Sequence, residues 1–147
     1  MKKLLLISSA GGHFVELMQL KPVFSKFKYV YVTADREDTK GMADYYVPDP
    51  GTNKLNYIRL FFSYLSIMWK EKPDIIMTTG AGIALPMIFW AKLLRKKVVF
   101  IESFCRPFEL SEAGKIIYKY NLADLFLVQW SELAEKWPRA KYWGRVV

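Results

Sequence analysis

The chain has 147 residues, 52% of them hydrophobic, which is enough to bury a core and argues against intrinsic disorder. We expect one domain over residues 1–147. The formal net charge of +8 indicates an anionic partner, such as nucleic acid, an anionic lipid or a phosphorylated substrate. A single cysteine excludes an intramolecular disulfide, and one cysteine with one histidine excludes thiolate-rich and histidine-rich metal sites.

The N-terminal apolar run after Lys2 and Lys3 is too short for a secretory signal and lacks a cleavage site. Nowhere does an apolar run approach the ~20 residues that a membrane-spanning helix needs. We therefore expect a cytoplasmic chain that is either soluble or bound to a membrane surface.

Residues 3–16 read KLLLISSAGGHFVE, a pattern that predicts a strand, a glycine turn and a helix. Gly11 and Gly12 allow the backbone to approach a ligand closely, and the helix that follows directs its free N–H groups at the same place. The pattern is typical of a site for an anionic group such as phosphate. A turn that only packs the strand against the helix remains the alternative.

Strands and helices alternate along the rest of the chain. We assign helices to residues 13–27, 53–70, 83–94, 111–120 and 131–137. Strands are expected at residues 28–33, 44–47, 74–78, 98–101 and 125–128, with residues 141–147 as a candidate for a last strand. Short connections of this kind predict right-handed βαβ units, hence an α/β fold with a Rossmann-like parallel sheet and helices on both faces.

Three details of these helices are predicted from local sequence. Pro22 is expected to break or kink the first helix, because proline removes a helical hydrogen bond. The inner stripe of that helix is assigned to Phe14, Val15, Leu17 and Met18. Ser111 is expected to cap the helix that it precedes.

The ends of three strands are expected to meet at one edge of a parallel sheet, where ligands of such folds bind. The residues at these ends are Gly11, Gly12 and His13; Thr79, Gly80, Ala81 and Gly82; and Glu102, Ser103 and Arg106. Two glycine turns could grip a diphosphate from two sides, and the guanidinium could pair with a phosphate oxygen.

Two side chains in this group are candidates for general acid–base chemistry. His13 can bond a phosphate or take a proton from a hydroxyl, and its structural alternative is a helix-cap histidine. Glu102 is the second candidate base, and its alternative is a carboxylate satisfied by backbone N–H groups of the turn. Glu16 is expected to serve as a helix cap, and Cys105, with no base beside it, is expected to be inert.

A nicotinamide cofactor is not expected. Asp35 follows the second strand, where a dinucleotide fold keeps its ribose-binding acid, but the first turn reads AGGHFV and lacks the G-x-G-x-x-G spacing.

The helices predicted at 53–70 and 83–94 are apolar around nearly their whole circumference, and a small domain cannot easily cover both. Basic residues flank them, namely Lys54, Arg59, Lys70, Arg95, Lys96 and Lys97. Apolar surface rimmed by cations favours docking on anionic lipid over the alternative of solvated helix ends. Nucleic acid is not expected as a partner, because the basic residues are scattered and the aromatic residues lie within apolar helices.

Four stretches in order resemble a known family, the oligosaccharide-biosynthesis subunits related to asparagine-linked glycosylation protein fourteen. They are SSAGGHFVEL from residue 8, TTGAGIALP from residue 78, IESFCRP from residue 101 and ADLFLVQW from residue 123, and the ending KYWGRVV also fits. Within that family the chain is most similar to the bacterial capsule and exopolysaccharide subunits. The resemblance covers nearly the whole sequence.

The resemblance implies the acceptor-side half of a split inverting glycosyltransferase of GT-B architecture, related to the N-terminal half of that fold. A second polypeptide would bind the nucleotide-sugar, and the pair would extend a lipid-diphosphate-linked saccharide at the cytoplasmic face of the membrane. By position, His13 and Glu102 become the candidate catalytic residues. The candidate substrate-binding residues are Gly11, Gly12, Gly80, Gly82, Ser103 and Arg106.

Further expectations concern attachment, metal and activity. Attachment would be peripheral, and no cofactor or metal is expected, since residues 35–38 are a poor imitation of an Asp-x-Asp motif. The chain alone should be inactive. The alternative reading is a non-catalytic scaffold that activates a complete partner enzyme, and a nucleotide-binding regulator is a further rival.

Overall fold

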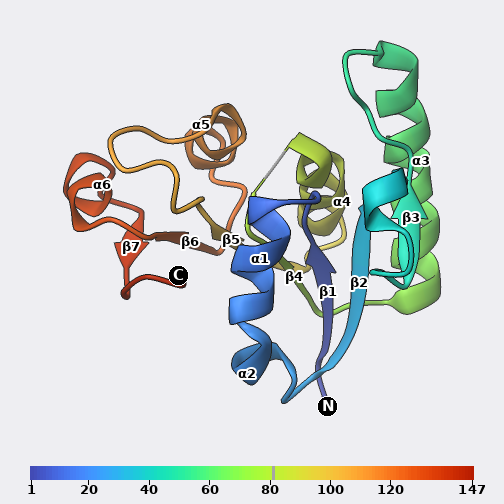
Figure 1. Cartoon of the computed structure of the whole chain (residues 1–147), viewed down its shortest axis with the longest axis horizontal. Helices are drawn as coiled ribbons and strands as arrows, with labels where there is room; N and C mark the ends of the chain where they lie inside the picture. The colour runs from blue at the N-terminus through green and yellow to red at the C-terminus, as the bar shows by residue number, and fades with distance from the viewer. Residues whose placement is uncertain (81) are drawn as a thin grey trace.

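The computed structural model describes residues 1–80 and 82–147, so Ala81 lies outside the described residues. Within them, one all-parallel sheet has the strand order β3-β2-β1-β4-β5-β6-β7 (Figure 1). The strands are β1 (Lys3–Ile7), β2 (Lys28–Ala34), β3 (Tyr45–Val47), β4 (Ile75–Thr78), β5 (Lys97–Ile101), β6 (Leu125–Val128) and β7 (Lys141–Tyr142). The chain winds outward from β1 to one edge and then returns to the other side of β1. The switch point therefore lies between β1 and β4, where ligands of doubly wound folds bind.

Helices cover both faces of this sheet, so the predicted fold class is confirmed. The α-helices are α1 (Gly12–Gln19), α2 (Lys21–Phe24), α3 (Lys54–Glu71), α4 (Leu85–Leu93), α5 (Glu112–Lys119) and α6 (Ser131–Lys136), with short 3-10 turns η1 (Glu37–Thr39) and η2 (Gly82–Ala84). Alternate residues of β1 point to opposite faces. Leu4 and Leu6 pack with α1 and α2, whereas Leu5 and Ile7 join the larger core beneath α3 to α6.

The helix predicted at 13–27 is two helices that part at Leu20, ahead of Pro22, so the expected break is confirmed. Leu17 is fully buried on the sheet, and Phe14 and Met18 pack beside it. The assignment of Val15 to the inner stripe was wrong, because this side chain is 51% exposed. It lies on the side of α1 that faces away from the sheet.

Two caps fix where helices begin. Asn53 precedes α3 and its side chain accepts a hydrogen bond from Leu55 N at 2.9 Å. Ser111 precedes α5 and accepts from Gly114 N at 3.0 Å, which confirms the predicted cap. Both helices therefore start at positions that local side chains determine.

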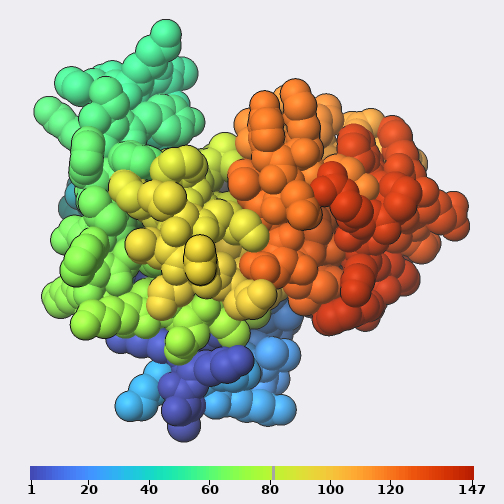
Figure 2. Space-filling model, turned by 180° about the vertical axis from the view of Figure 1, so that it is seen from behind, coloured from blue at the N-terminus to red at the C-terminus, as the bar shows by residue number. Residues whose placement is uncertain are grey.

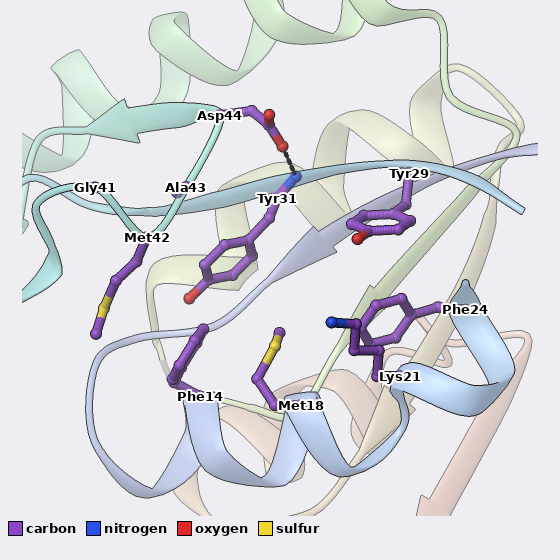
Figure 3. A pocket seen from close by; sticks show the side chains of 10 residues that line it. All are labelled: Phe14, Met18, Lys21, Phe24, Tyr29, Tyr31, Gly41, Met42, Ala43 and Asp44. Atoms are coloured by element: carbon purple, nitrogen blue, oxygen red, sulfur yellow. Dashed lines mark hydrogen bonds between the residues drawn. The ribbon is translucent and has the colours of Figure 1, made fainter.

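A hollow of about 320 Å³ lies on the α1 face, between α1, α2 and the connection from β2 to β3 (Figure 3). Its walls are aromatic: the rings of Phe14 and Tyr31 are 5.6 Å apart and those of Phe24 and Tyr29 are 4.9 Å apart. Asp44 accepts the Tyr31 N–H at 2.8 Å and so holds the connection against β2. The packing fixes α1 on the sheet, and with it the residues at the start of α1.

Candidate active-site cleft

The strand ends that the sequence singled out do meet at one cleft, of about 430 Å³. It lies between the start of α1, the residues after β4 and the loop from β5 to α5. Residues lining it include Gly12, His13, Gly82, Ser103, Cys105 and Arg106. Parallel pairing of β1 with β4 and of β4 with β5 brings these carboxyl-terminal strand ends to the same edge.

His13 is fixed by two hydrogen bonds to Thr79. Its Nδ1 lies 3.0 Å from the Thr79 carbonyl oxygen, and the Thr79 hydroxyl donates to the His13 carbonyl oxygen at 2.7 Å. A carbonyl oxygen can only accept, so Nδ1 carries a proton. In the neutral ring, Nε2 then has its lone pair available, which is the form that a general base requires.

The glycine turns make room for this ring. At Gly80, whose φ is +114°, a Cβ atom would lie 3.2 Å from His13 Cε1. The Gly80 N–H is held by the Thr78 hydroxyl at 3.2 Å. Gly11 has a φ of +80° and precedes the first residue of α1, and the first helical bond runs from Val15 N to the Gly11 carbonyl. The N–H groups at the start of α1 thus precede the helical ladder, as in helix N-termini that bind anions.

Glu102 is fully buried beneath the cleft. Its Oε1 accepts from Ser103 N at 2.9 Å, and its Oε2 accepts from Ser111 N and Ser111 Oγ, both at 3.0 Å. Burial raises the pKa of this carboxyl, while the Ser103 and Ser111 bonds and the charge of Arg106 act in the opposite direction. The geometry favours the alternative left open by the sequence, a carboxylate satisfied within the turn, and the role of Glu102 as a base stays a prediction.

Glu16 does not cap α1, so that expectation was wrong. It is 4% exposed and reaches across to the other strand ends. Its Oε1 accepts from Ser103 Oγ at 2.9 Å and from Phe104 N at 3.2 Å, and its Oε2 accepts from Gln129 Nε2 at 2.8 Å. The Ser103 hydroxyl is therefore engaged inside the protein.

Arg106 is exposed at the rim of the cleft. Its backbone N–H donates to the Ser103 carbonyl at 3.1 Å, so the turn from Ser103 sets its place. Its guanidinium forms none of the ion pairs found among residues 1–80 and 82–147. The side chain can thus meet an anion that enters the cleft.

An apolar surface adjoins the cleft and is formed by α3 and the start of α4. Figure 2 shows these two helices side by side on one face, α3 in green and α4 in yellow. Ile58, Phe62 and Phe89 are each more than half exposed there. Gly82 connects the two regions, because it lines the cleft and a Cβ on it would lie 3.7 Å from the Tyr57 hydroxyl, which belongs to the apolar surface. The large exposed apolar area that the sequence predicted on these helices is present.

In the described part of the chain no group of three or more histidine, cysteine, aspartate or glutamate side chains could hold a metal ion. The same residues include no helix that is long and apolar enough to cross a membrane.

Solved structures with the same fold include nucleotide-sugar enzymes. MurG from Acinetobacter baumannii superposes with a TM-score of 0.72 and 14% identity, over 90% of this chain and 43% of that one. UDP-N-acetylglucosamine 2-epimerase from Rickettsia bellii superposes with a TM-score of 0.77 and 17% identity, over 99% of this chain and 45% of that one. The chain thus corresponds to one Rossmann-like unit of GT-B type and spans less than half the length of these proteins.

Sequence comparison identifies the family. The family model described as oligosaccharide biosynthesis protein Alg14 like matches residues 52–146. The UDP-N-acetylglucosamine transferase subunit ALG14 of Homo sapiens is 31% identical over 98% of this chain and 82% of its own length, and that of Candida albicans is 27% identical over 99% and 78%. The chain therefore belongs to the Alg14-like family of oligosaccharide biosynthesis proteins.

Sequence reasoning did not assign a role to several residues that build the site. Thr79 orients His13, and Gln129, which is 1% exposed, links Glu16 to the backbone carbonyl of Glu102. Gly114 leaves the space that the Glu102 carboxylate occupies. These contacts join positions far apart in the chain, so no local sequence pattern predicts them.

Proposed function

We propose that this chain is the acceptor-side subunit of a two-chain inverting glycosyltransferase that adds a sugar to a lipid-diphosphate-linked saccharide. The donor would be a UDP-sugar, with UDP-N-acetylglucosamine the first choice from the names of the relatives. The observation that carries the proposal is a cleft that combines an oriented histidine, an exposed guanidinium and a helix N-terminus beside an apolar surface.

The proposed chemistry uses His13 as the base. An acceptor hydroxyl attacks the anomeric carbon of the sugar nucleotide with inversion, its proton passes to Nε2, and the bond to the nucleotide diphosphate breaks. The bond from Nδ1 to the Thr79 carbonyl would stabilise the imidazolium that forms, as a second partner does in other histidine bases. Stabilisation of the departing diphosphate would come largely from the partner.

The acceptor diphosphate would be bound by Arg106 and by the N–H groups at the start of α1. A guanidinium provides paired donors for phosphate oxygens, and the helix terminus adds a positive dipole end. The net charge of +8 favours such a ligand.

The lipid would lie against the apolar surface of α3 and α4. Lys54 and Arg59, on the first turns of α3, lie at the end that adjoins the cleft. Cations near exposed apolar side chains are typical of peripheral binding to anionic lipid. We propose attachment at the cytoplasmic membrane face, in cell-surface polysaccharide synthesis of the bacterial capsule type.

A second polypeptide would supply the donor half. The chain covers 43% and 45% of the lengths of the two solved proteins, so more than half of each has no counterpart in this chain. The word subunit in the names of the relatives supports the same division. A nucleotide-sugar would therefore reach the cleft through the partner.

Reconstitution tests the proposal. The chain, a candidate donor-half polypeptide and both together are incubated with UDP-N-acetylglucosamine and a polyprenyl-diphosphate saccharide, and the product is measured. We expect product only with both chains, and a loss of about 10²–10⁴-fold in kcat for His13→Ala. Full transfer by this chain alone would contradict the split active site. Transfer by the partner alone, together with an unchanged rate for the pair that carries His13→Ala, would also contradict it and would support a scaffold.

Binding can be tested without the partner. Cys105 is the one cysteine of the sequence, is exposed and lines the cleft. Geranyl diphosphate should slow its alkylation by iodoacetamide in the wild type and much less in Arg106→Ala, whereas geraniol should not. Equal protection by geraniol would show that the cleft recognises the lipid and not the diphosphate.

A further inference from the structure

Glu16 on α1 and the turn from Ser103 to Arg106 belong to two different walls of the cleft, and they contact each other. Glu16 lies one helical turn after His13, on the face of α1 that borders the cleft. It belongs to the structural unit that carries the base, whereas Arg106 belongs to the loop after β5. A contact between the two units determines how far apart the base and the guanidinium lie.

Among the described residues, each hydrogen-bond partner of the Glu16 carboxylate is a donor. The four contacts are Ser103 Oγ at 2.9 Å, Phe104 N at 3.2 and 3.3 Å to the two oxygens, and Gln129 Nε2 at 2.8 Å. Glu16 takes part in none of the salt bridges among the described residues. Within the described residues, hydrogen bonds and not an ion pair therefore hold the buried carboxylate, and bonds of this kind to a charged acceptor are strong.

The turn that Glu16 holds is the one that carries Arg106. Ser103 Oγ, which donates to Glu16, also accepts from Cys105 N at 3.3 Å, and the Ser103 carbonyl accepts from Arg106 N at 3.1 Å. Phe104 is held on its other side as well, because its carbonyl accepts from Trp130 Nε1 at 2.7 Å. The backbone from Ser103 to Arg106 therefore depends on Glu16 for its attachment to α1.

We propose that Glu16 is a positioning residue that fixes Arg106 relative to His13, so that the diphosphate is held where the base can act. The identity of the ligand rests on the proposed function, whereas the contact between Glu16 and the turn is independent of it. A carboxylate suits this task because it is an acceptor only. Glutamine at this position would place an NH₂ group against Gln129 Nε2 or against the donors Ser103 Oγ and Phe104 N.

The test compares Glu16→Gln with Glu135→Gln, a matched loss of one charge on the exposed side of α6. Amide hydrogen exchange is measured at Phe104 and Cys105. We expect exchange about tenfold faster in Glu16→Gln, because an opening that breaks one bond to a charged acceptor becomes easier. Amides of β1 and β4, and all amides of Glu135→Gln, should keep their rates. Unchanged exchange at Phe104 would overturn the inference.

The second measurement is protection of Cys105 by geranyl diphosphate. Half-protection should need about tenfold more ligand in Glu16→Gln, while the rate of alkylation at saturating ligand returns to the wild-type value. Ser103→Ala keeps the charge and removes one donor, so it should give a smaller change in the same direction. If geranyl diphosphate does not protect Cys105 in the wild type, the proposed function fails. Faster exchange at Phe104 in Glu16→Gln would then still support the attachment of the turn to α1. If wild type and Glu16→Gln are protected equally, the positioning role fails.

Discussion

Replacing Gly114 with alanine tests how closely α5 is fitted to the buried Glu102 carboxylate. A Cβ atom at this position would lie 2.1 Å from Glu102 Oε2 and 3.0 Å from Ser111 Oγ. The carboxylate would have to move, and it is held there by two bonds of 3.0 Å from Ser111. The substitution should therefore affect stability in two opposite ways: alanine has the higher helix propensity, but a buried interaction of Glu102 is lost.

The expected magnitude follows from these two opposing effects. Glycine to alanine in an unobstructed helix stabilises by about 1 kcal/mol. Breaking one hydrogen bond to a charged group costs about 1.5–3 kcal/mol, and forcing the Cβ into a packed site adds about 1 kcal/mol or more. We expect a net destabilisation of about 2 kcal/mol, which lowers Tm by roughly 4–8 °C in a chain of this size.

Urea and thermal unfolding of four variants measure this effect: Gly114→Ala, Glu102→Ala, the double variant of these two, and Gly12→Ala. Gly12→Ala is the control, because a Cβ at Gly12 meets nothing within 4 Å. In a protein that already carries Glu102→Ala, the Gly114→Ala substitution should lower the free energy of unfolding far less than it does in the wild type. The difference between these two losses is the coupling energy between the two positions. A Gly114→Ala protein that is more stable than wild type by about 1 kcal/mol would refute the reasoning.

Three further changes give distinct outcomes. Gly80→Ala adds a Cβ 3.2 Å from His13 Cε1 at a φ of +114°, so it should destabilise by about 1–2 kcal/mol and shift the His13 ring signals in NMR spectra. Glu71 accepts from Lys3 Nζ and the Tyr45 hydroxyl, and these bonds hold its pKa below the usual value of 4.5. Glu71→Gln should therefore cost about 1 kcal/mol at pH 7 in urea unfolding, and the difference should disappear as the pH falls through that lowered pKa; a difference that persists at pH 2 would contradict this. Phe62→Ser should weaken co-sedimentation with anionic vesicles, whereas Val15→Ser, on an exposed side of α1, should not; equal binding by both would exclude the α3 surface.

The sequence was sufficient to predict the parallel sheet and the edge at which several strand ends meet, because alternation of strands and helices leaves few topologies. From parallel pairing alone it also followed that His13, Gly82 and Arg106 would line one cleft. Ser111 was predicted as a cap because capping depends on residues within one turn.

Other features depend on contacts between distant positions. Glu16 meets Ser103 and Gln129, which are 87 and 113 residues away, so its first-turn position suggested a cap that the fold does not use. Burial of Glu102 depends on the fit of α5, which no strand pattern encodes. The side of α1 that carries Val15 depends on how the helix sits on β1 and β2.

We propose that the cleft binds a diphosphate beside a histidine whose Nε2 can accept a proton. His13 is the one histidine of the sequence, so the imidazole nitrogen spectrum of ¹⁵N-histidine-labelled protein reports on it alone. We predict the Nδ1–H tautomer of the neutral ring, with signals that shift on titration with geranyl diphosphate in the wild type and far less in Arg106→Ala. An Nε2–H tautomer, or signals that do not respond to the diphosphate, would contradict it.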